Sequence, residues 1–389
     1  MQTSVKLTPK GLKWLKTGHL WIYREDIASG ADESLNGEVV RVESSAGTFL
    51  AQAFYSYRST IALRIISLSE RPPDREYFRT LITGALGRRG EMFGAQTACR
   101  LASAEGDLFP GLIVDHYAGH LVAQILIPGV EKLKAILVDI LKEVYSPRSI
   151  TLRCDATVRE MEGLPLYKEM AAGEPQHRVE VQEGTARYLA DLWDGHKTGA
   201  YLDQQANRLC ISRWARGRAL DAFCYHGHFS LHLARECDEV VAMDSSDASI
   251  SRLRENCELN GLANVTPRKA KVFEALGEMQ SGGELFDIII LDPPPFARSR
   301  KDLSSAGKGY GEINRRALRL LKPGGILATY SCSYNLAAER FLEVLRKAAA
   351  DVRRKVQVTA YQFQSPDHPI LLTVPETHYL KGLILEVLD

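Results

Sequence analysis

Apolar and polar residues alternate in three short runs near the start of the chain, at residues 37–44, 47–56 and 61–67. Alternation with a period of two, bounded by glycine and serine turns, is typical of strands that bury one face. Together with the short basic amphipathic stretch before them, these runs predict a small β-barrel over residues 1–70. The proline pair at 72–73 ends the pattern, so a second unit is expected to begin there.

The next part of the chain mixes two periodicities. Residues 76–94 and 130–145 carry apolar positions three and four apart, which is the helical pattern. Residues 111–126 and 149–155 are strand candidates on either side of the second of these helices. Residues 71–185 are therefore predicted to form a central α+β domain.

From residue 186 onward, short apolar strands alternate regularly with helical segments. Strands are expected within 218–224, 239–246, 286–296 and 324–333, and helices within 229–236, 248–261, 311–322 and 338–352. This alternation predicts a largely parallel sheet covered by helices, so residues 186–389 are assigned to an α/β domain.

Composition is that of an ordinary globular protein, with 45% hydrophobic and 25% charged residues in a chain of 389. The net charge of +1 argues neither for nor against a polyanionic partner. No stretch approaches the roughly 18 apolar residues that span a bilayer, and the start lacks a signal-peptide core, so a cytoplasmic location is expected. The seven cysteines contain no C-x-x-C pair, which disfavours a disulfide framework and a cysteine-rich zinc site.

Two acids stand at the ends of neighbouring strands of the α/β domain. Asp221 ends the first strand, and a turn containing Gly227 leads into a helix, an arrangement that binds nucleotide-like ligands. Asp244 ends the next strand about 20 residues later, where a carboxylate accepts ribose hydroxyls. No phosphate-cradling loop is present, so S-adenosylmethionine fits better than NAD or ATP. The alternative is an α/β domain whose strand ends happen to carry acids.

Two further strand ends carry candidate chemistry. Asp292 follows an apolar strand and precedes three prolines, which lack N–H donors and form a rigid loop beside the cofactor crevice. Cys332 ends a later strand between two serines. That position favours a nucleophile over the alternative of a small buried core residue.

Ordered motifs cover nearly the whole chain, among them GHLWIY, RLASAEGDLFPGLIVD, GHKTGAYLDQQANR, LDAFCYHGHFS, LDPPPFA, KGYGEINRRAL, YSCS, DHP and ETHYLK. Through them the chain resembles the large-subunit (23S-type) ribosomal RNA cytosine-C5 methyltransferases that carry an N-terminal PUA domain. The resemblance implies a PUA-type RNA-binding barrel at 1–70, a linking domain at 71–185 and a Rossmann-like class I methyltransferase domain at 186–389. It also implies ribosomal RNA as partner and allows a homodimer.

The resemblance assigns roles to the two candidate residues. Cys332 is the thiolate that adds to C6 of cytosine, which makes C5 nucleophilic toward the sulfonium methyl group. Asp292 hydrogen-bonds or protonates the N3 side of the ring. The base that removes the C5 proton stays open, with water or hydroxide as candidates. No metal is expected, because His226, His228 and His232 fit a turn and helix start better than a metal site.

The resemblance also indicates which residues bind S-adenosylmethionine. For those in GHKTGAYLDQQANR, the alternative is a solvated amphipathic helix. The expected set is Lys197, Gln204, Asp221, Phe223, Tyr225, Gly227, Phe229, Asp244, Ser245, Lys271, Val272, Asp292 and Pro293.

Basic residues gather next to the proline loop, where 298–322 contains eight basic and two acidic side chains. This excess of +6 predicts a patch that grips the RNA backbone, the alternative being a helix charged for solubility. At the start of the barrel, lysines lie among Trp14 and Trp21, which either stack on bases or pack in the core. The expected RNA-binding set is Lys13, Lys16, Arg298, Arg300, Lys301, Lys308 and Arg315.

Two other functions are compatible with the same residues. An Asp-Pro-Pro loop can orient an amine, so methylation of a nitrogen of adenine or guanine is one alternative, and it needs no cysteine. The other is a non-catalytic RNA-binding or ribosome-assembly factor that retains a vestigial cofactor fold.

Overall fold

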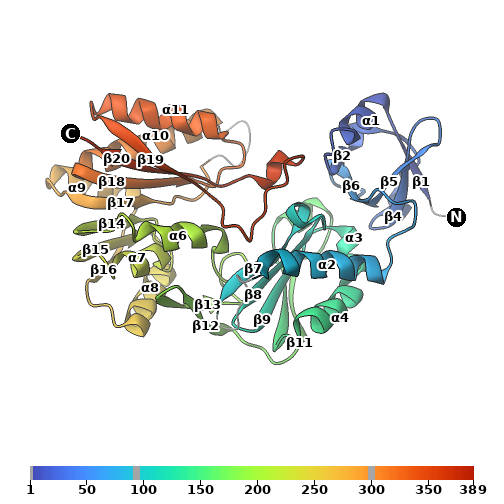
Figure 1. The fold of residues 1–389 in the computed structure, drawn as a ribbon, viewed down its shortest axis with the longest axis horizontal. Helices are drawn as coiled ribbons and strands as arrows, with labels where there is room; N and C mark the ends of the chain where they lie inside the picture. The colour runs from blue at the N-terminus through green and yellow to red at the C-terminus, as the bar shows by residue number, and fades with distance from the viewer. Residues whose placement is uncertain (1–2, 91–96, 297–302) are drawn as a thin grey trace. The chain divides into compact units, whose positions relative to one another are not determined.

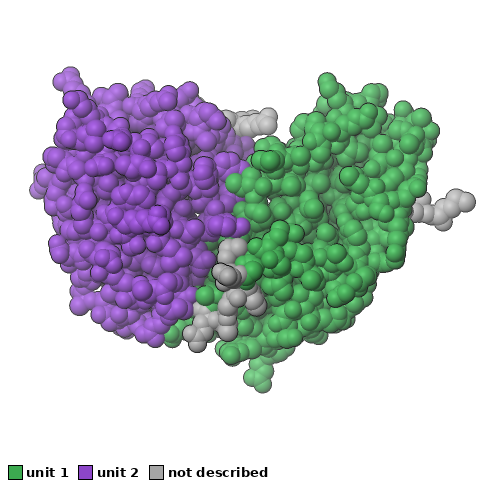
Figure 2. Space-filling model, in the orientation of Figure 1, with its two compact units in different colours: residues 1–181, 190–202, 367–377 green, residues 182–189, 203–366, 378–389 purple. Residues whose placement is uncertain are grey.

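The computed structural model of the protein describes residues 3–90, 97–296 and 303–389, with the backbone alone at 303–306. The chain forms two compact units, coloured separately in Figure 2. Unit 1 comprises residues 1–181, 190–202 and 367–377, and unit 2 comprises residues 182–189, 203–366 and 378–389.

The alternating segments near the N-terminus build the first sheet of unit 1. Its six strands lie in the order β2-β6-β5-β4-β1-β3, and helix α1 (Pro9–Leu15) follows its first strand. Val40 and Val42 are fully buried while Arg41 between them is half-exposed, which is the predicted alternation. The strands are β1 (Ser4–Leu7), β2 (Trp21–Tyr23), β3 (Ile27–Ser29), β4 (Val39–Glu43), β5 (Phe49–Tyr55) and β6 (Ile61–Ser67).

A second sheet of unit 1, in the order β11-β10-β9-β8-β7, forms the predicted α+β part. The strand expected at 111–126 is a hairpin that turns at Ala118 and Gly119, both with positive φ. Helices α2 (Arg75–Arg89) and α4 (Lys134–Tyr145) lie beside this sheet (Figure 1). Their apolar side chains are buried in the same core as those of the sheet. The remaining elements are β7 (Ala98–Ser103), β8 (Leu112–Tyr117), β9 (His120–Ile125), α3 (Pro128–Lys132), β10 (Ser149–Cys154), α5 (Val158–Met161) and β11 (Tyr167–Ala172).

A late segment of the chain, 367–377, belongs to unit 1, where buried hydrogen bonds connect it to earlier residues of that unit. Asp367 accepts the backbone N–H of Arg100 at 2.8 Å, and its carbonyl oxygen accepts the Arg89 guanidinium at 2.7 Å. Strands β12 (Arg178–Glu183) and β13 (Ala186–Asp191) form a separate two-stranded sheet.

Unit 2 contains the predicted α/β sheet, with seven strands in the order β16-β15-β14-β17-β18-β20-β19. The strands from β14 to β18 run parallel, as predicted, whereas β20 runs antiparallel to both of its neighbours. The strands are β14 (Arg218–Ala222), β15 (Glu239–Asp244), β16 (Val265–Lys269), β17 (Phe286–Leu291), β18 (Leu321–Ser331), β19 (Val356–Phe363) and β20 (Lys381–Val387).

Helices cover both faces of this sheet (Figure 1). Alternate residues of β14 point to opposite sides, so Leu220 joins the core under one set of helices and Ala219 joins the other. α9 (Val272–Ser281), α10 (Leu303–Leu320) and α11 (Ala338–Asp351) share the core of Leu220, whereas α6 (Gln205–Ile211) and α7 (His228–Leu233) share that of Ala219; α8 (Asp247–Asn260) packs beside β15 and β16. No helix among the described residues is long and apolar enough to span a bilayer.

The strand order reverses at β14, whose two neighbours, β15 and β17, lie on opposite sides of it. Connections leave such a point in opposite directions, which opens a crevice at the carboxyl ends of the strands. At this edge, Asp221 is the penultimate residue of β14 and Asp244 is the last residue of β15, while Asp292 and Cys332 directly follow β17 and β18.

Candidate functional site: a cofactor crevice and a cysteine beside the proline loop

The turn after β14 has an unusual backbone. Phe223 and Tyr225 have φ values of 66° and 51°, and Gly227 has a φ of 80° as the residue that precedes α7. Side chains disfavour this left-handed region, and such backbone strain concentrates at ligand sites. A Cβ atom on Gly227 would lie 2.1 Å from Cδ1 of Leu253, so glycine is required here for space as well as conformation.

Asp244 fixes the same turn from the end of β15. One of its carboxylate oxygens accepts the backbone N–H of Tyr225 at 3.1 Å, and the other accepts that of Ser246 at 2.9 Å. The carboxylate is half-buried, and Ser245 beside it is exposed. Each oxygen keeps a lone pair, so the group can still accept hydroxyl donors from a ligand.

Asp221 is fully buried at the end of β14. Ser230 donates to one of its oxygens at 2.6 Å, while the other has no hydrogen-bond partner in the part of the chain that the structure describes. Burial raises the pKa of this carboxyl from 3.8 to about 6, although the Ser230 hydrogen bond acts in the opposite direction. A buried acceptor without a donor is costly, so this oxygen suits a cationic or N–H-bearing ligand.

The other residues expected near the cofactor differ in exposure. Phe223 is half-buried against the core, whereas Phe229 is buried and its ring lies 5.5 Å from that of Tyr330. Lys271 is exposed just before α9, and Val272 is buried as the first residue of that helix.

Asp292 directly follows β17 and is oriented by two buried amides. Gln204 donates to its Oδ1 at 3.0 Å, and Asn207 donates to the Oε1 of Gln204 at 2.6 Å. This chain of bonds holds the Asp292 carboxylate in one orientation at the sheet edge. Pro293 after it is buried, as expected of a rigid loop.

Cys332 lies in the loop that follows β18. It is half-buried, and its Sγ lies 4.0 Å from the carbonyl oxygen of Pro293. The flanking Ser331 and Ser333 are fully buried, and Ser333 shares a hydrogen bond of 2.9 Å with the hydroxyl of Tyr310 on α10. The serines therefore anchor the loop, and the cysteine beside the proline loop retains access to solvent.

The structure adds residues to which the sequence assigned no role. Lys381, at the start of β20, donates to the carbonyl oxygen of Ser333 at 2.8 Å. Tyr379 donates to Asp203 at 2.9 Å, next to Gln204. Both residues belong to the motif ETHYLK, in which polar residues lead into a buried strand. That pattern is the sequence feature that could have indicated a role for them.

Comparison with known proteins identifies the family. The PUA-like domain profile matches residues 5–68, and the S-adenosylmethionine-dependent methyltransferase profile matches residues 156–362. Ribosomal RNA large subunit methyltransferase I of Shewanella amazonensis is 36% identical over 395 residues, covering 100% of both chains. The protein of that name from Aeromonas salmonicida is 37% identical over 381 residues, covering 96% of each chain.

The chain belongs to the ribosomal RNA large subunit methyltransferase I family. Its methyl donor is S-adenosylmethionine, as the two strand-end acids predicted. Asp221, with its unpaired oxygen, and the half-buried Asp244 fit the amine and hydroxyl groups of this molecule.

Solved structures share the fold over the full length. A candidate methyltransferase complexed with SAH is 22% identical with a TM-score of 0.87, covering 99% of this chain and 100% of that one. A candidate SAM-dependent methyltransferase from Streptococcus mutans is 23% identical with a TM-score of 0.84 and the same coverage. They confirm the fold of the α/β methyltransferase domain and the fold of the two parts of the chain that precede it.

The stretch 195–208 of this methyltransferase is not a solvated amphipathic helix. Thr198, Asp203, Gln204 and Arg208 are all buried, so that alternative is wrong for them. Lys197 is exposed, with a φ of 55°, and its ammonium lies 4.5 Å from the ring centre of Tyr201.

Lys13 and Lys16, expected to bind RNA, are exposed on and just after α1. The tryptophans near them have internal partners. Trp14 donates its indole N–H to the carbonyl of Trp21 at 2.8 Å, and Trp21 donates to Glu105 at 2.8 Å. Packing within unit 1, the alternative for Trp21, therefore accounts for both side chains.

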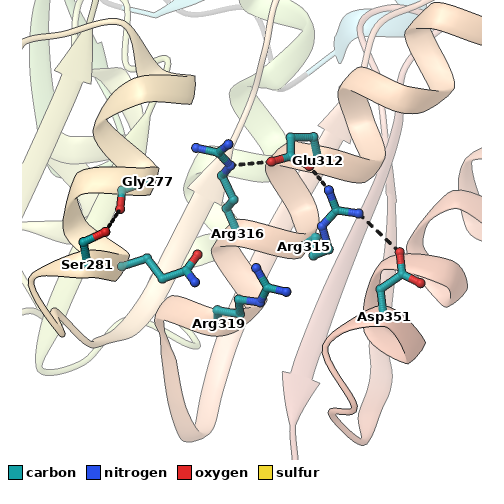
Figure 3. A pocket seen from close by; sticks show the side chains of 8 residues that line it. Gly277, Ser281, Glu312, Arg315, Arg316, Arg319 and Asp351 are labelled. Atoms are coloured by element: carbon teal, nitrogen blue, oxygen red, sulfur yellow. Dashed lines mark hydrogen bonds and ion pairs between the residues drawn. The ribbon is translucent and has the colours of Figure 1, made fainter.

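The basic run beside the proline loop is partly neutralised. Arg315 and Arg316 both pair with Glu312, and Arg315 also reaches Asp351 at 3.3 Å (Figure 3). These four side chains line an open pocket of about 500 Å³ between α9, α10 and α11. Lys308 is exposed on α10. The other three predicted contacts, Arg298, Arg300 and Lys301, lie outside the described residues.

The three histidines near the cofactor turn are buried. His232 contacts Glu183 at 3.0 Å, and burial lowers the pKa of His228 well below its usual range. Among the described residues, no group of histidine, cysteine or acidic side chains is arranged to hold a metal ion.

Proposed function

We propose that this methyltransferase forms 5-methylcytosine in large-subunit ribosomal RNA through a covalent bond between Cys332 and C6 of the base. The observation that carries the proposal is the half-buried Sγ of Cys332, 4.0 Å from the carbonyl oxygen of Pro293 in the loop after Asp292. The names of the relatives, which specify large-subunit ribosomal RNA, support the substrate class.

The chemistry follows from the needs of the reacting atoms. C5 of cytosine is a poor nucleophile until a thiolate adds to C6 and its electron pair moves into the ring. Asp292, held by Gln204, hydrogen-bonds the N3 side of the ring and stabilises the charge that develops there. S-adenosylmethionine supplies an activated methyl group when bound. Loss of the C5 proton then expels Cys332 as a thiolate.

For the cofactor we propose the set expected from the sequence. Asp244 accepts the ribose hydroxyls, and Asp221 faces the cationic end of the molecule. Support comes from the strained turn at Tyr225 and Gly227, in which the backbone N–H of Tyr225 donates to Asp244. The remaining proposed contacts are Lys197, Gln204, Phe223, Phe229, Ser245, Lys271, Val272 and Pro293.

For the RNA we propose contacts from the exposed lysines Lys13, Lys16 and Lys308, whose ammonium groups can neutralise phosphates. Arg315 adds a contact only if RNA competes with Glu312 and Asp351 for its guanidinium. Arg298, Arg300 and Lys301 complete the proposed set on the strength of the sequence.

The organisation of the protein is part of the proposal. We assign RNA binding to residues 1–70, a linking role to 71–185 and catalysis to 186–389, in the cytoplasm. The PUA-like match over 5–68 supports the first boundary. Light scattering over a concentration series tests the homodimer that the family resemblance allows.

Methylation of ribosomal RNA by the Cys332→Ala variant tests the function. We expect activity to fall by at least about three orders of magnitude, because the thiolate has no substitute. Cys210→Ala, at the other half-buried cysteine, serves as the matched control and should keep full activity. Nucleoside mass spectrometry identifies the product. Methylated adenine or guanine formed by Cys332→Ala would instead establish nitrogen methylation.

A further inference from the structure

Lys381 is a buried lysine beside the loop of Cys332. It opens β20 opposite Ser331, the last residue of β18, and only 5% of it is exposed. Its ammonium donates to the carbonyl oxygen of Ser333 at 2.8 Å, so it bonds the loop on the residue that follows the cysteine. Removing an ammonium group from water is costly, and such groups are normally paired with a carboxylate.

Among the residues that the structure describes, no carboxylate forms an ion pair with Lys381. Burial lowers the pKa of Lys381 to about 8, and a negative charge at Cys332 acts in the opposite direction. Because Lys381 bonds the residue that directly follows Cys332, a thiolate at Cys332 is a negative charge that this ammonium can stabilise.

A further titratable neighbour of Lys381 is His378, which lies shortly before β20. Burial lowers the pKa of His378, and the charge of Lys381 lowers it further, while Glu339 on α11 opposes both. A neutral His378 adds no second positive charge beside Lys381. From β19, Phe363 pairs with Lys381 in the sheet register and brings no charge.

We infer that Lys381 is a positioning residue for Cys332, which holds the loop through the Ser333 carbonyl and stabilises negative charge on the sulfur. The inference rests on the proposed role of Cys332 as nucleophile. In addition to that role of Cys332, a second side chain, Lys381, assists both the formation of the thiolate and its release from the base.

The steps balance without a change in Lys381 itself. The thiol proton passes to solvent, and the ammonium keeps its own protons while it donates to the Ser333 carbonyl. On attack, the sulfur forms its bond to C6 and the negative charge moves into the ring. C5 then uses that electron pair to form its bond to the methyl group, whose bond to the sulfonium sulfur breaks and leaves a neutral thioether. When a base removes the C5 proton, the C5–H electron pair re-forms the C5–C6 double bond, the C6–S bond breaks with its pair on sulfur, and the thiolate is stabilised again.

Alkylation of Cys332 by iodoacetamide across a pH series, followed by peptide mass spectrometry, tests the inference. Lys381→Met keeps the length of the side chain and removes its charge. At neutral pH we expect it to slow alkylation of Cys332 by about tenfold or more, because an opposite charge favours a thiolate. Lys381→Arg keeps the charge and should restore most of the rate.

Two controls belong to the same samples. Cys210 reports any general change in reactivity, and Lys347→Met removes an exposed lysine of α11. Binding of S-adenosylhomocysteine reports that Lys381→Met is folded. Unchanged alkylation of Cys332 in a folded Lys381→Met protein would overturn the inference.

The pH profile of methyl transfer gives a second readout that needs no uncharged variant. In the wild type, the rate should fall above pH of about 8 as Lys381 loses its proton. Lys381→Arg should lack this fall, because arginine stays protonated. An identical fall in both proteins would also contradict the inference. If Cys332→Ala retains activity, the proposed function fails, while the alkylation result still decides the role of Lys381.

Discussion

At the scale of single residues, burial changes how readily the side chain of Asp221 loses its proton. Asp221 and Asp244 end neighbouring parallel strands, yet only Asp221 is fully buried. Burial raises its pKa to about 6, so the folded state binds this proton more tightly than the unfolded chain does. Its contribution to stability is therefore greatest below the ordinary pKa of 3.8 and is lost as pH rises to about 6.

Asp221→Asn should stabilise the unliganded protein at neutral pH, by at most about 3 kcal/mol, because it removes a buried charge. The same change should weaken S-adenosylmethionine binding, since the cationic end of the cofactor loses its counter-charge. Urea unfolding and calorimetric titration measure the two effects. A variant that is less stable at neutral pH, or that binds the cofactor as tightly as wild type, would contradict this account of Asp221.

At the scale of elements, the turn between β14 and α7 depends on Gly227. We expect Gly227→Ala to cost about 1 to 3 kcal/mol more than Gly261→Ala, which shares the left-handed conformation. A new Cβ at Gly227 meets Leu253, whereas one at Gly261 meets nothing within 4 Å. Thermal unfolding and binding of S-adenosylhomocysteine compare the variants. Equal losses would mean that backbone conformation alone, and not the close contact, fixes this turn.

Much of the α/β domain could be predicted because strand ends are local signals. Asp221, Asp244, Asp292 and Cys332 were each found from an apolar run that stops at a polar residue. The antiparallel placement of β20 was not predicted, since no local pattern distinguishes it from its parallel neighbours.

Buried charges were the other feature that the sequence concealed. Arg208 was compatible with an exposed helix, yet it forms a buried ion pair with Glu183 at 2.6 Å. Burial raises the pKa of Glu183, but the charge of Arg208 outweighs it and holds that pKa well below the usual range. Lys381 was missed for the same reason, because a lysine at a strand start is normally exposed.

At the scale of the whole molecule, RNA binding is expected to draw on lysines far in sequence from Cys332. Replacing Lys13 and Lys16 together by glutamine should weaken RNA binding and reduce the slope of log affinity against log salt by about 1 to 2. Filter binding over a salt series measures this. The rate at saturating RNA should be unchanged, and a slope equal to that of wild type would remove both lysines from the interface.

The covalent bond between Cys332 and the base is the central claim, and one trapping measurement tests it most directly. The protein is incubated with S-adenosylmethionine and ribosomal RNA containing 5-fluorocytosine, whose fluorine cannot leave C5 as a proton does. Denaturing gels and mass spectrometry should show a stable protein–RNA adduct on Cys332, absent in Cys332→Ala. Methylation of unmodified RNA without any adduct, or an adduct on another residue, would contradict the claim.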